Sequence, residues 1–544
     1  ATYATLPQTG GVTVNTNGKL KLTGNFTVDL SRTLTTAGQT TVTGNLTNAG
    51  TLSAGGGTVS AVDFSNSGTI TTTEPTAFTF TGTNFVNTGS MSLKVKNSNS
   101  YTTVTAANAI LDSSGGTVTI VYSGGYIATN TYTLMTGTGA ALIPTITQPT
   151  YNNSFIKSMV ASVSGNKLLL TVERNGFNQH ATSSLGIKVG NFMEQVGCGC
   201  ESNVQSQVLS SLHEITDSKA LDTSLVQLAP LSHGVVHSLD VHTQQQAQIE
   251  TRVAALHNSY YSAGEHGVEY GLWMQPFLTA GKQKDLGDIL GYKAKTTGIV
   301  VGADKDIDPR TVVGVAASYA KSNVHALTNS VTHTDIKTYL AMIYGSYKLK
   351  HKINLDWLVS GGTNFYEGLR LIDIVPTKSL AQSKYLGQQF SAQLVASKRW
   401  MYNNISLSPQ LSANLVHMRQ HSYTETGAGN LNMSVTLQNP TALTVGAGVR
   451  ASTPYKHRTY DYLPEIHAML YYDLQSGAQN ATSTFVTGGP SLKTNATPGR
   501  ITGQLGASVT IDVTDQFKVK ANYDLQIKSR YVNSVGYLNL RYVF

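Results

Sequence analysis

Residues 265 to 544 form a long series of two-faced segments, and this feature constrains the fold more than any other. Twelve candidate strands follow one another, each near the roughly 9 to 11 residues that a tilted membrane-spanning strand requires. In FKVKANYDLQIK, apolar side chains alternate with Lys518, Lys520, Asp524 and Lys528 at the period of a β-strand. The series predicts a 12-stranded antiparallel transmembrane β-barrel with a water-filled lumen.

The same alternation predicts which side of each strand meets the lipid. In a water-filled barrel the apolar face should meet lipid and the charged face the lumen. On one such strand the residues expected to face lipid are Ile336, Leu340, Met342 and Tyr344, opposite Asp335 and Lys337. A soluble sandwich that buries its apolar faces is the alternative, although twelve long strands of this polarity are unusual in one.

The final segment, GYLNLRYVF, shows the same pattern. Its more apolar face carries Leu538, Leu540, Tyr542 and Phe544, and its other face carries Tyr537, Asn539, Arg541 and Val543. Soluble chains usually end in a few solvated residues. We therefore predict that this segment is the last barrel strand, with Tyr542 and Leu540 toward lipid and Arg541 and Asn539 toward the lumen.

Residues 1 to 176 repeat with a period near 20, which predicts a right-handed parallel β-solenoid of roughly eight coils. The pattern Asn-x-Gly-x-apolar begins at Asn48, Asn66 and Asn87. Asn and Gly suit the corners because both tolerate positive φ. The residues expected to point inward are Leu46, Leu52, Phe64, Ile70, Phe85 and Met91.

Residues 181 to 258 have a helical pattern, so the fold class is all-β with a helical linker. Pro230 is expected to separate two helices. The last helix carries Ile249, Val253 and Leu256 on one face but is otherwise very polar. A helix that is polar nearly all round has no ordinary core to join, so we expect it inside a wet lumen.

Composition excludes several classes of protein. Only 12% of the residues are charged, against about 25% in an average domain. No run or stripe of Lys and Arg exists, so nucleic acid is not an expected partner. No run of about 18 apolar residues exists, which argues against a transmembrane helix. The opening ATYATLPQTGG lacks a signal peptide, which is either absent or already removed, or the chain begins inside a longer surface protein.

Two groups of residues could hold a metal. Cys198 and Cys200 in VGCGCE are two thiols in a glycine turn, a local disulfide, or a redox or soft-metal site. His233 and His237 lie four residues apart on a predicted helix, a spacing that can bind a metal, with Asp240 and His242 nearby. The motif His-Glu-x-x-His is absent, so an exposed or lumen-facing helix is the favoured interpretation.

No enzymatic site is expected. Asp304, Asp306 and Asp308 resemble calcium ligands, but the Gly and Glu positions of such a loop are missing, which favours a polar hairpin turn. The N-terminal region has no Gly-x-Ser-x-Gly and no His before Thr171, which argues against a Ser-His-Asp hydrolase. We expect no catalytic residue, no metal and no cofactor.

Two motifs connect this architecture to a known family. The linker motif in ALDTSLVQLAPLSHGVVHSL consists of Leu225, Leu228 and Pro230. The motif of the first barrel strands consists of Trp273, Gln275, Phe277, Gly291, Tyr292, Gly298, Gly302 and Asp304. With the C-terminal Phe544, the chain resembles the classical (type Va) autotransporters of Gram-negative bacteria, and its composition is loosely like that of surface antigens of rickettsia-type bacteria.

The resemblance implies a function. Residues 265–544 would be an outer-membrane translocator, the helix near 240–258 would thread its pore, and residues 1–176 would be a surface-exposed passenger, an adhesin or surface antigen. The implied partners are outer-membrane lipid, the barrel-assembly machinery that reads the terminal strand, and a host-cell receptor or a second copy. That helix has no Asn-Asn pair, so the passenger is expected to stay attached. The alternatives are a porin-like channel with an N-terminal decoration and a passenger with an unrecognised enzyme activity.

Overall fold

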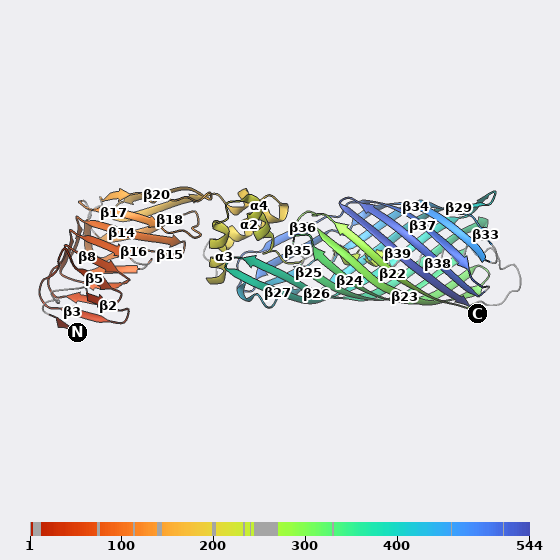
Figure 1. Cartoon of the computed structure of the whole chain (residues 1–544), viewed down its shortest axis with the longest axis horizontal. Helices are drawn as coiled ribbons and strands as arrows, with labels where there is room; N and C mark the ends of the chain where they lie inside the picture. The colour runs from red at the N-terminus through yellow and green to blue at the C-terminus, as the bar shows by residue number, and fades with distance from the viewer. Residues whose placement is uncertain are drawn as a thin grey trace. The chain divides into compact units, whose positions relative to one another are not determined.

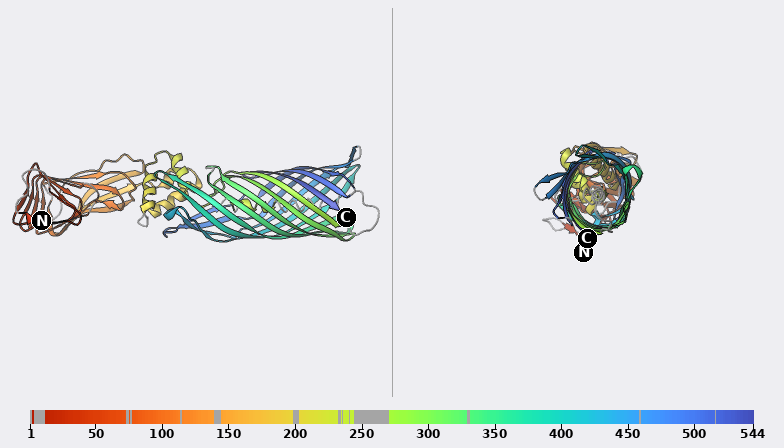
Figure 2. Two further views of the ribbon diagram at one scale, coloured as in Figure 1. Left: turned by 60° about the horizontal axis from the view of Figure 1, so that its bottom comes forward. Right: turned by 90° about the vertical axis from the view of Figure 1, so that its right-hand side faces the viewer.

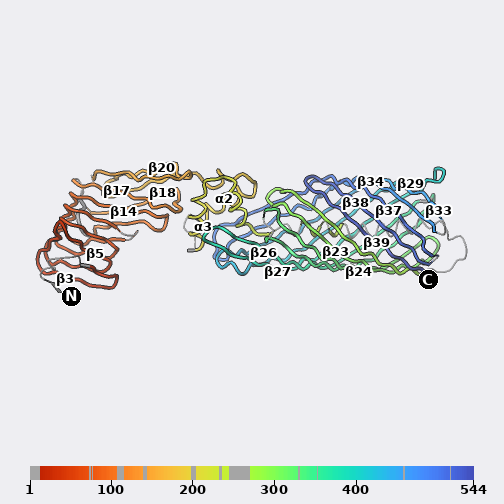
Figure 3. The backbone as a smooth tube through the Cα atoms, viewed as in Figure 1, coloured from red at the N-terminus to blue at the C-terminus, as the bar shows by residue number. Residues whose placement is uncertain are grey.

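The computed structural model describes residues 2–3, 12–72, 75, 77–112, 115–138, 144–197, 203–231, 234, 236–239, 241–243, 270–328, 331–457, 460–514 and 516–544. The chain separates into two compact units (Figures 1 and 3). The solenoid unit comprises Ala1–Thr182, Gly190–Asp222 and Ile374–Thr377. The barrel unit comprises Ser183–Val189, Thr223–Asp373 and Lys378–Phe544.

The solenoid unit is built from stacked parallel strands on three faces. The first face contains β2 (Val12–Val14), β5 (Thr33–Thr36), β8 (Thr51–Ala54), β11 (Thr69–Thr72), β14 (Ser90–Asn97), β17 (Thr117–Tyr122) and β19 (Thr145–Thr147). The second contains β1 (Thr2–Tyr3), β3 (Lys19–Leu22), β6 (Gln39–Val42), β9 (Gly57–Ser60), β12 (Ala77–Thr81) and the start of β16 (Thr103–Asp112). The third contains β4 (Phe26–Val28), β7 (Leu46–Asn48), β10 (Asp63–Asn66), β13 (Asn84–Asn87) and the end of β16, and β15 (Ser100–Tyr101) pairs with β14.

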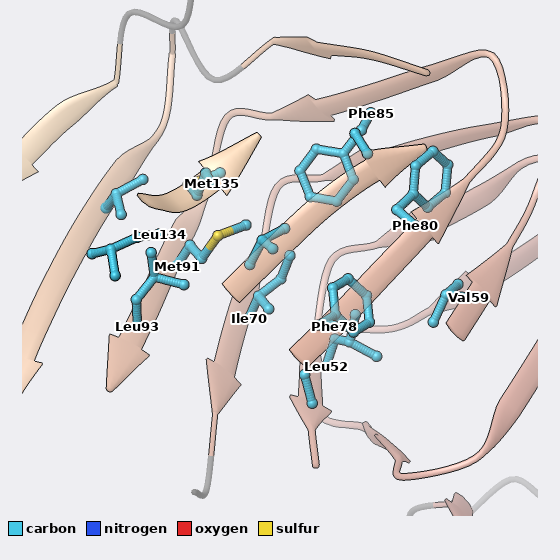
Figure 4. Packing of buried hydrophobic residues seen from close by; sticks show 14 of the residues in the cluster. Leu52, Val59, Ile70, Phe78, Phe80, Phe85, Met91, Leu93, Leu134 and Met135 are labelled. Carbon is cyan, nitrogen blue, oxygen red and sulfur yellow. The ribbon is translucent and has the colours of Figure 1, made fainter. Parts of the chain in front are cut away.

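Alternation along these short strands sends every second side chain inward, and stacking the coils buries them in one continuous core. The inward prediction is confirmed, since Leu46, Leu52, Phe64, Ile70, Phe85 and Met91 are all buried. The rings of Phe64, Phe80 and Phe85 pack against one another, with centroids 4.9 to 5.6 Å apart. Figure 4 shows Phe80 and Phe85 side by side within this core.

The repeated asparagines lie inside the solenoid, and the prediction that positive φ places them at corners is wrong. Asn48, Asn66 and Asn87 are buried and form a ladder in which Asn48 Nδ2 donates to Asn66 Oδ1 and Asn66 Nδ2 to Asn87 Oδ1, both at 2.6 Å. Neither these residues nor the glycines of the motif have positive φ. The glycines are needed for close stacking instead: a Cβ on Gly68 would lie 2.2 Å from the carbonyl oxygen of Gly50.

The prediction of roughly eight coils is also wrong. In the described residues, five complete coils begin at β2, β5, β8, β11 and β14. Beyond β17 and β19 the chain forms an antiparallel sheet of β18 (Asn130–Thr138), β20 (Ile156–Ser164) and β21 (Lys167–Arg174), joined to the solenoid through β16. Leu134, Leu168 and Leu170 from this sheet belong to the solenoid core. The sheet therefore covers apolar surface that a further coil would otherwise bury.

In the described residues up to Val226, four helices follow: α1 (Phe177–His180), α2 (Ser184–Val196), α3 (Asn203–His213) and α4 (Ser218–Val226). In the solenoid unit, the buried guanidinium of Arg174 forms an ion pair with Glu194 of α2. The same guanidinium lies over the rings of Tyr126 and Phe177, at 4.5 and 4.8 Å from their centroids. A buried cation that is both paired and covered by aromatic rings fixes α2 against the end of the antiparallel sheet.

His213 at the end of α3 is fully buried in the same region. Its Nε2 lies 3.2 Å from the Tyr122 hydroxyl, and its ring stacks on Phe155 at a centroid distance of 5.6 Å. Burial, with the positive charge of Arg174 as a second cause, lowers the pKa of the His213 imidazole to about 3.

The barrel unit is a closed antiparallel barrel of twelve long strands, counted in the described residues. They are β22 (Tyr270–Gln283), β23 (Tyr292–Asp308), β24 (Thr311–Ala326), β25 (His333–Lys348), β26 (Ile353–Ile374), β27 (Thr377–Lys398), β29 (Ile405–Gln420), β32 (Thr441–Ser452), β34 (Tyr460–Ser476), β37 (Ile501–Asp512), β38 (Phe517–Lys528) and β39 (Tyr531–Val543). Neighbours in this order are paired, and β39 returns to β22 to close the barrel. The end-on view in Figure 2 shows the closed ring of strands.

Short elements extend or connect these strands. β28 (Trp400–Tyr402) pairs with β29 and β33 (Tyr455–His457) with β34, and two 3-10 turns span Lys350–Lys352 and Gly429–Leu431. A separate loop sheet consists of β30 (Tyr423–Thr424), β31 (Met433–Leu437), β35 (Gln479–Phe485) and β36 (Leu492–Ala496). Among the described residues, no helix combines the length and apolar character needed to cross a membrane.

The two last strands face as predicted. On β38, Lys520, Asn522 and Asp524 are buried in the barrel, whereas Tyr523 and Ile527 are exposed on the outside. On β39, Asn539 is buried and Tyr542 is exposed.

The orientation predicted for β25 is wrong. Ile336, Leu340, Met342 and Tyr344 are buried inside the barrel, where the last three join an apolar cluster with Trp273 and Phe277. The outer face of β25 is also apolar, with Tyr339 and Ile343 exposed, while Lys337 lies on the same side toward one end. β25 has 16 residues, more than a bilayer needs, so charges at its end can lie beyond the hydrocarbon layer.

Candidate functional site: the barrel lumen and its plug

The wall of the lumen on β32, β34 and β38 is lined by paired charges. Glu465 accepts from Arg450 at 3.3 Å and from Lys520 at 3.4 Å, and Lys528 pairs with Asp473 at 2.7 Å. These side chains alternate with outward apolar ones because each strand has period two. A polar interior with paired charges suits a barrel whose lumen holds water or a polypeptide.

Part of the linker lies inside this lumen. Residues 236–239 and 241–243 are helical, and Val241 is buried in the luminal apolar cluster beside Trp273 and Phe277. His237 Nε2 lies 3.1 Å from Thr296 Oγ1, and the Tyr366 hydroxyl donates to Ser238 Oγ at 2.9 Å. We call the described residues 227–231, 234, 236–239 and 241–243 the plug segment. Its contact with the wall explains why β25 is apolar toward the lumen.

The three residues of the linker motif lie where the chain turns into the plug segment. Leu225 and Leu228 are fully buried, and the main chain turns through a hydrogen bond of 2.9 Å from Leu228 N to Leu225 O. α4 ends at Val226, and helical geometry resumes after Pro230, which fits the expected break.

The structure pairs two aromatic residues of the barrel motif with two of its glycines. Trp273 on β22 lies opposite Gly302 on β23, and Phe277 lies opposite Gly298. A Cβ on Gly302 would meet the indole at 2.5 Å, and one on Gly298 would meet the Phe277 ring at 2.4 Å. Each aromatic ring therefore lies over a glycine of the neighbouring strand.

The same motif contributes to the closure of the barrel. Trp273 Nε1 donates to the Tyr344 hydroxyl at 2.7 Å, and this hydroxyl donates to Asp304 Oδ2 at 2.9 Å. Asp304 also lies 3.8 Å from Arg541 Nη2 on the last strand. These contacts connect β22, β23 and β25 to β39, so the first and last strands are held together from within the lumen.

Of the remaining motif residues, Gln275 and Tyr292 lie on β22 and β23, and Gly291 immediately precedes β23. Asn539 Nδ2 donates to Gln275 Oε1 at 2.8 Å, a second contact between β39 and β22. Tyr292 is fully buried, with its ring centroid 6.0 Å from that of His237 in the plug segment. Gly291, next to Tyr292, donates its N–H to Asp285 Oδ1 at 2.7 Å.

The C-terminal residues lie on the outer surface of the barrel. Leu538, Tyr542 and Phe544 are exposed, and Leu540 is partly so. Phe544 and Tyr270 exchange two main-chain hydrogen bonds of 3.0 and 3.1 Å, and their rings stack at 6.1 Å. The terminal phenylalanine thus completes the pairing of the closing strands.

Several predicted residues fall outside the described ones, namely Cys198, Cys200, His233, Asp240, Ile249, Val253 and Leu256. Asp304 is luminal, whereas Asp308 is exposed and accepts the N–H of Arg310 at 2.7 Å in a turn. Within the described part of the chain, no group of three or more His, Cys, Asp or Glu side chains could hold a metal ion.

Sequence reasoning missed other luminal residues. Arg370 forms a buried ion pair with Glu425, and the rings of Tyr366, Tyr385 and Tyr423 form a stack. No local signal identifies them, because their partners come from separate strands and loops.

Comparison with known proteins supports this geometry. Residues 272–524 match the family model described as autotransporter beta-domain. The chain is 25% identical over 344 residues to outer membrane protein B of Rickettsia conorii, covering 56% of this chain and 20% of that protein. It is 23% identical over 459 residues to outer membrane protein B of Rickettsia prowazekii, covering 77% of this chain and 27% of that one. The chain therefore spans less than a third of the length of these relatives.

Among solved structures, the translocator domain of the autotransporter NalP from Neisseria meningitidis aligns with a TM-score of 0.44 and 14% identity, covering 56% of this chain and 97% of that one. The family match and the closed barrel agree with each other. The barrel of this chain is an outer-membrane autotransporter β-domain, and the chain resembles classical autotransporters of the rickettsial surface-antigen type.

Proposed function

We propose that the barrel carries the preceding part of the chain to the cell surface and then anchors it in the outer membrane. The plug segment carries this proposal: this part of the barrel unit lies in the lumen and is held there by Thr296, Tyr366 and Tyr423 of the wall and loops. A plain porin has no need of a buried, apolar contact such as Val241 in its lumen. The plug segment is the polypeptide expected to remain in the pore when export ends.

Conductance in planar bilayers tests this part of the proposal. The intact chain should give a small conductance, and a variant lacking residues 240–258 should open to a much larger one. Equal, large conductance in both proteins would contradict the proposal and favour a porin with an N-terminal decoration.

We further propose that the solenoid unit is a non-enzymatic adhesive surface. Supporting this, one column of outward hydroxyl groups runs along its first face, with one residue per coil in parallel register: Thr33, Thr51, Thr69, Ser90, Thr117 and Thr145. Stacked strands lie about 4.8 Å apart, so the column repeats at that interval. A repeating uncharged surface suits multiple weak contacts with a host-cell receptor or a second copy of the chain.

Adhesion of bacteria that display the chain to host cells tests this second part. Replacing Thr51, Thr69 and Thr117 together by Val removes three hydroxyls but keeps β-branched side chains, and adhesion should fall. The matched control replaces Thr58, Thr79 and Thr105 by Val; these residues form the corresponding column on the second face. Equal adhesion by both variants and the parent would exclude this column as the adhesive surface.

Export is proposed to depend on two further partners. The barrel-assembly machinery would read the terminal strand with Leu538, Leu540, Tyr542 and Phe544 on one face. Outer-membrane lipid would cover the exposed apolar residues of the wall, among them Leu505, Leu470 and Ile466.

A further inference from the structure

Arg370 on β26 joins the plug segment to a loop of the barrel. Its side chain is buried, and its Nη1 donates to the main-chain oxygen of Gln227 at 2.7 Å. Its Nε donates to Glu425 Oε1 at 3.0 Å, and its Nη2 donates to Glu425 Oε2 and to the Leu431 oxygen. One guanidinium therefore binds the plug segment and a loop at the same time.

The partners of Arg370 on the loop side are positioned by the loop sheet. Glu425 follows β30, and its Oε2 accepts the N–H of Met433, the first residue of β31, at 2.9 Å. Met433 also pairs with Phe485 on β35, and both are buried. The carboxylate thus reaches Arg370 only when the loop sheet has formed.

A stack of three tyrosines provides a second connection. The rings of Tyr366, Tyr385 and Tyr423 lie parallel within 9°, with successive centroids 4.5 Å apart. At one end the Tyr423 hydroxyl donates to the Leu231 oxygen at 3.2 Å, and at the other the Tyr366 hydroxyl donates to Ser238. The stack spans β26, β27 and the start of the loop sheet, so it holds the plug segment at two points.

We propose that Arg370, Glu425 and the tyrosine stack form a latch that closes the pore by coupling the plug segment to the folded loop sheet. Arg370 is the positioning residue, because its planar fork serves a carboxylate and two carbonyls together, which a lysine ammonium cannot. Folding of the loop sheet on the outer side then seals the pore after the preceding chain has passed. This inference rests on the proposed function only in treating the barrel as a plugged translocator.

Single-channel recording of the full chain tests the latch. The variant Arg370→Met with Glu425→Gln removes both charges together, which avoids leaving one of them buried and unpaired. The open probability should rise roughly tenfold, the change expected from losing one hydrogen bond to a charged group. Tyr423→Phe removes only the hydroxyl that binds Leu231. It should also raise the open probability, with less risk to folding.

The matched control is Lys528→Met with Asp473→Asn, which removes one positive and one negative charge from the lumen wall. These two side chains pair with each other, and the other side-chain partner described for Asp473, Thr444, lies on barrel strand β32. Heat-modifiable electrophoretic mobility confirms that each variant is a folded barrel. Unchanged opening in the two latch variants, or equal opening in the control, would overturn the proposal.

Surface display of an epitope inserted at Gly165 separates this inference from the proposed function. Latch variants that display the epitope normally while opening more often support the latch. Folded variants that open normally reject the latch, whatever their display. Loss of display in the parent chain would reject the proposed function instead.

Discussion

Acidification to pH 5 should loosen the helical end of the solenoid unit through His213. The Tyr122 hydroxyl donates to the Gly125 oxygen, so His213 Nε2 must carry the hydrogen that it shares with Tyr122. Its Nδ1 is buried and has no hydrogen-bond partner among the residues that the structure describes. A second proton would occupy Nδ1, without an acceptor and near the positive charge of Arg174.

The expected loss of folding stability follows from the pKa of His213, which is about 3 in the folded chain against 6.5 for the ordinary side chain. Because the folded-state pKa is the lower one, the unfolded state binds the proton first. Stability is complete above about pH 6.5 and falls as the pH drops toward 3. At pH 5, about 1.5 pH units below the unfolded value, the loss is about 2 kcal/mol.

Hydrogen exchange of the α3 amides in the full chain, measured between pH 7.5 and pH 5 and corrected for intrinsic rates, tests this expectation. His213→Gln keeps an N–H donor near Tyr122 but cannot take up a proton, so it should abolish the pH dependence. His180→Gln is the matched control in the same unit and should retain it. If acid loosened His213→Gln as much as the parent chain, burial of this imidazole would not be the cause.

Three further changes test the packing. Asn66→Leu should destabilise the solenoid by about 1–3 kcal/mol per unsatisfied partner, since Asn48 and Asn87 lose their buried hydrogen bonds to Asn66. A denaturant midpoint equal to that of the surface variant Thr79→Val would contradict a stabilising role of the asparagine ladder. Gly302→Ala should destabilise the barrel by about 1–3 kcal/mol because the added methyl group meets Trp273. The temperature at which the electrophoretic mobility changes from that of the folded to that of the unfolded barrel should fall. Gly503→Ala, where the added methyl group meets no atom, should leave this temperature unchanged. Removing Phe544 should lower the amount of membrane-inserted barrel, and normal assembly would count against its proposed role in closure.

Much of the fold could be predicted because the two-residue alternation of a β-strand is visible in local sequence. The alternation in β38 and β39 assigned their faces correctly, and the spacing of Leu46, Phe64 and Phe85 identified the solenoid core. β25 was assigned wrongly because both of its faces are largely apolar. Its inner face contacts the plug segment around Val241, and local sequence does not show that a barrel contains part of its own chain.

The candidate site was less predictable because its contacts are long-range. Arg370 and Glu425 are separated by 55 residues and meet only when β30 and β31 fold over the barrel. The asparagine ladder had a visible signal, since identical residues recur after 18 and 21 positions. Corner geometry is the wrong interpretation of that signal, because the amide groups bond to one another inside the core.

Surface labelling of intact cells tests the central claim most directly. An epitope inserted at Gly165, an open turn between β20 and β21, should bind antibody on intact cells that produce the full chain. The matched control places the same epitope at Asn403, in a turn at the same end of the barrel as Phe544, where antibody should bind only after permeabilisation. An epitope at Gly165 that becomes accessible only after permeabilisation would contradict the account.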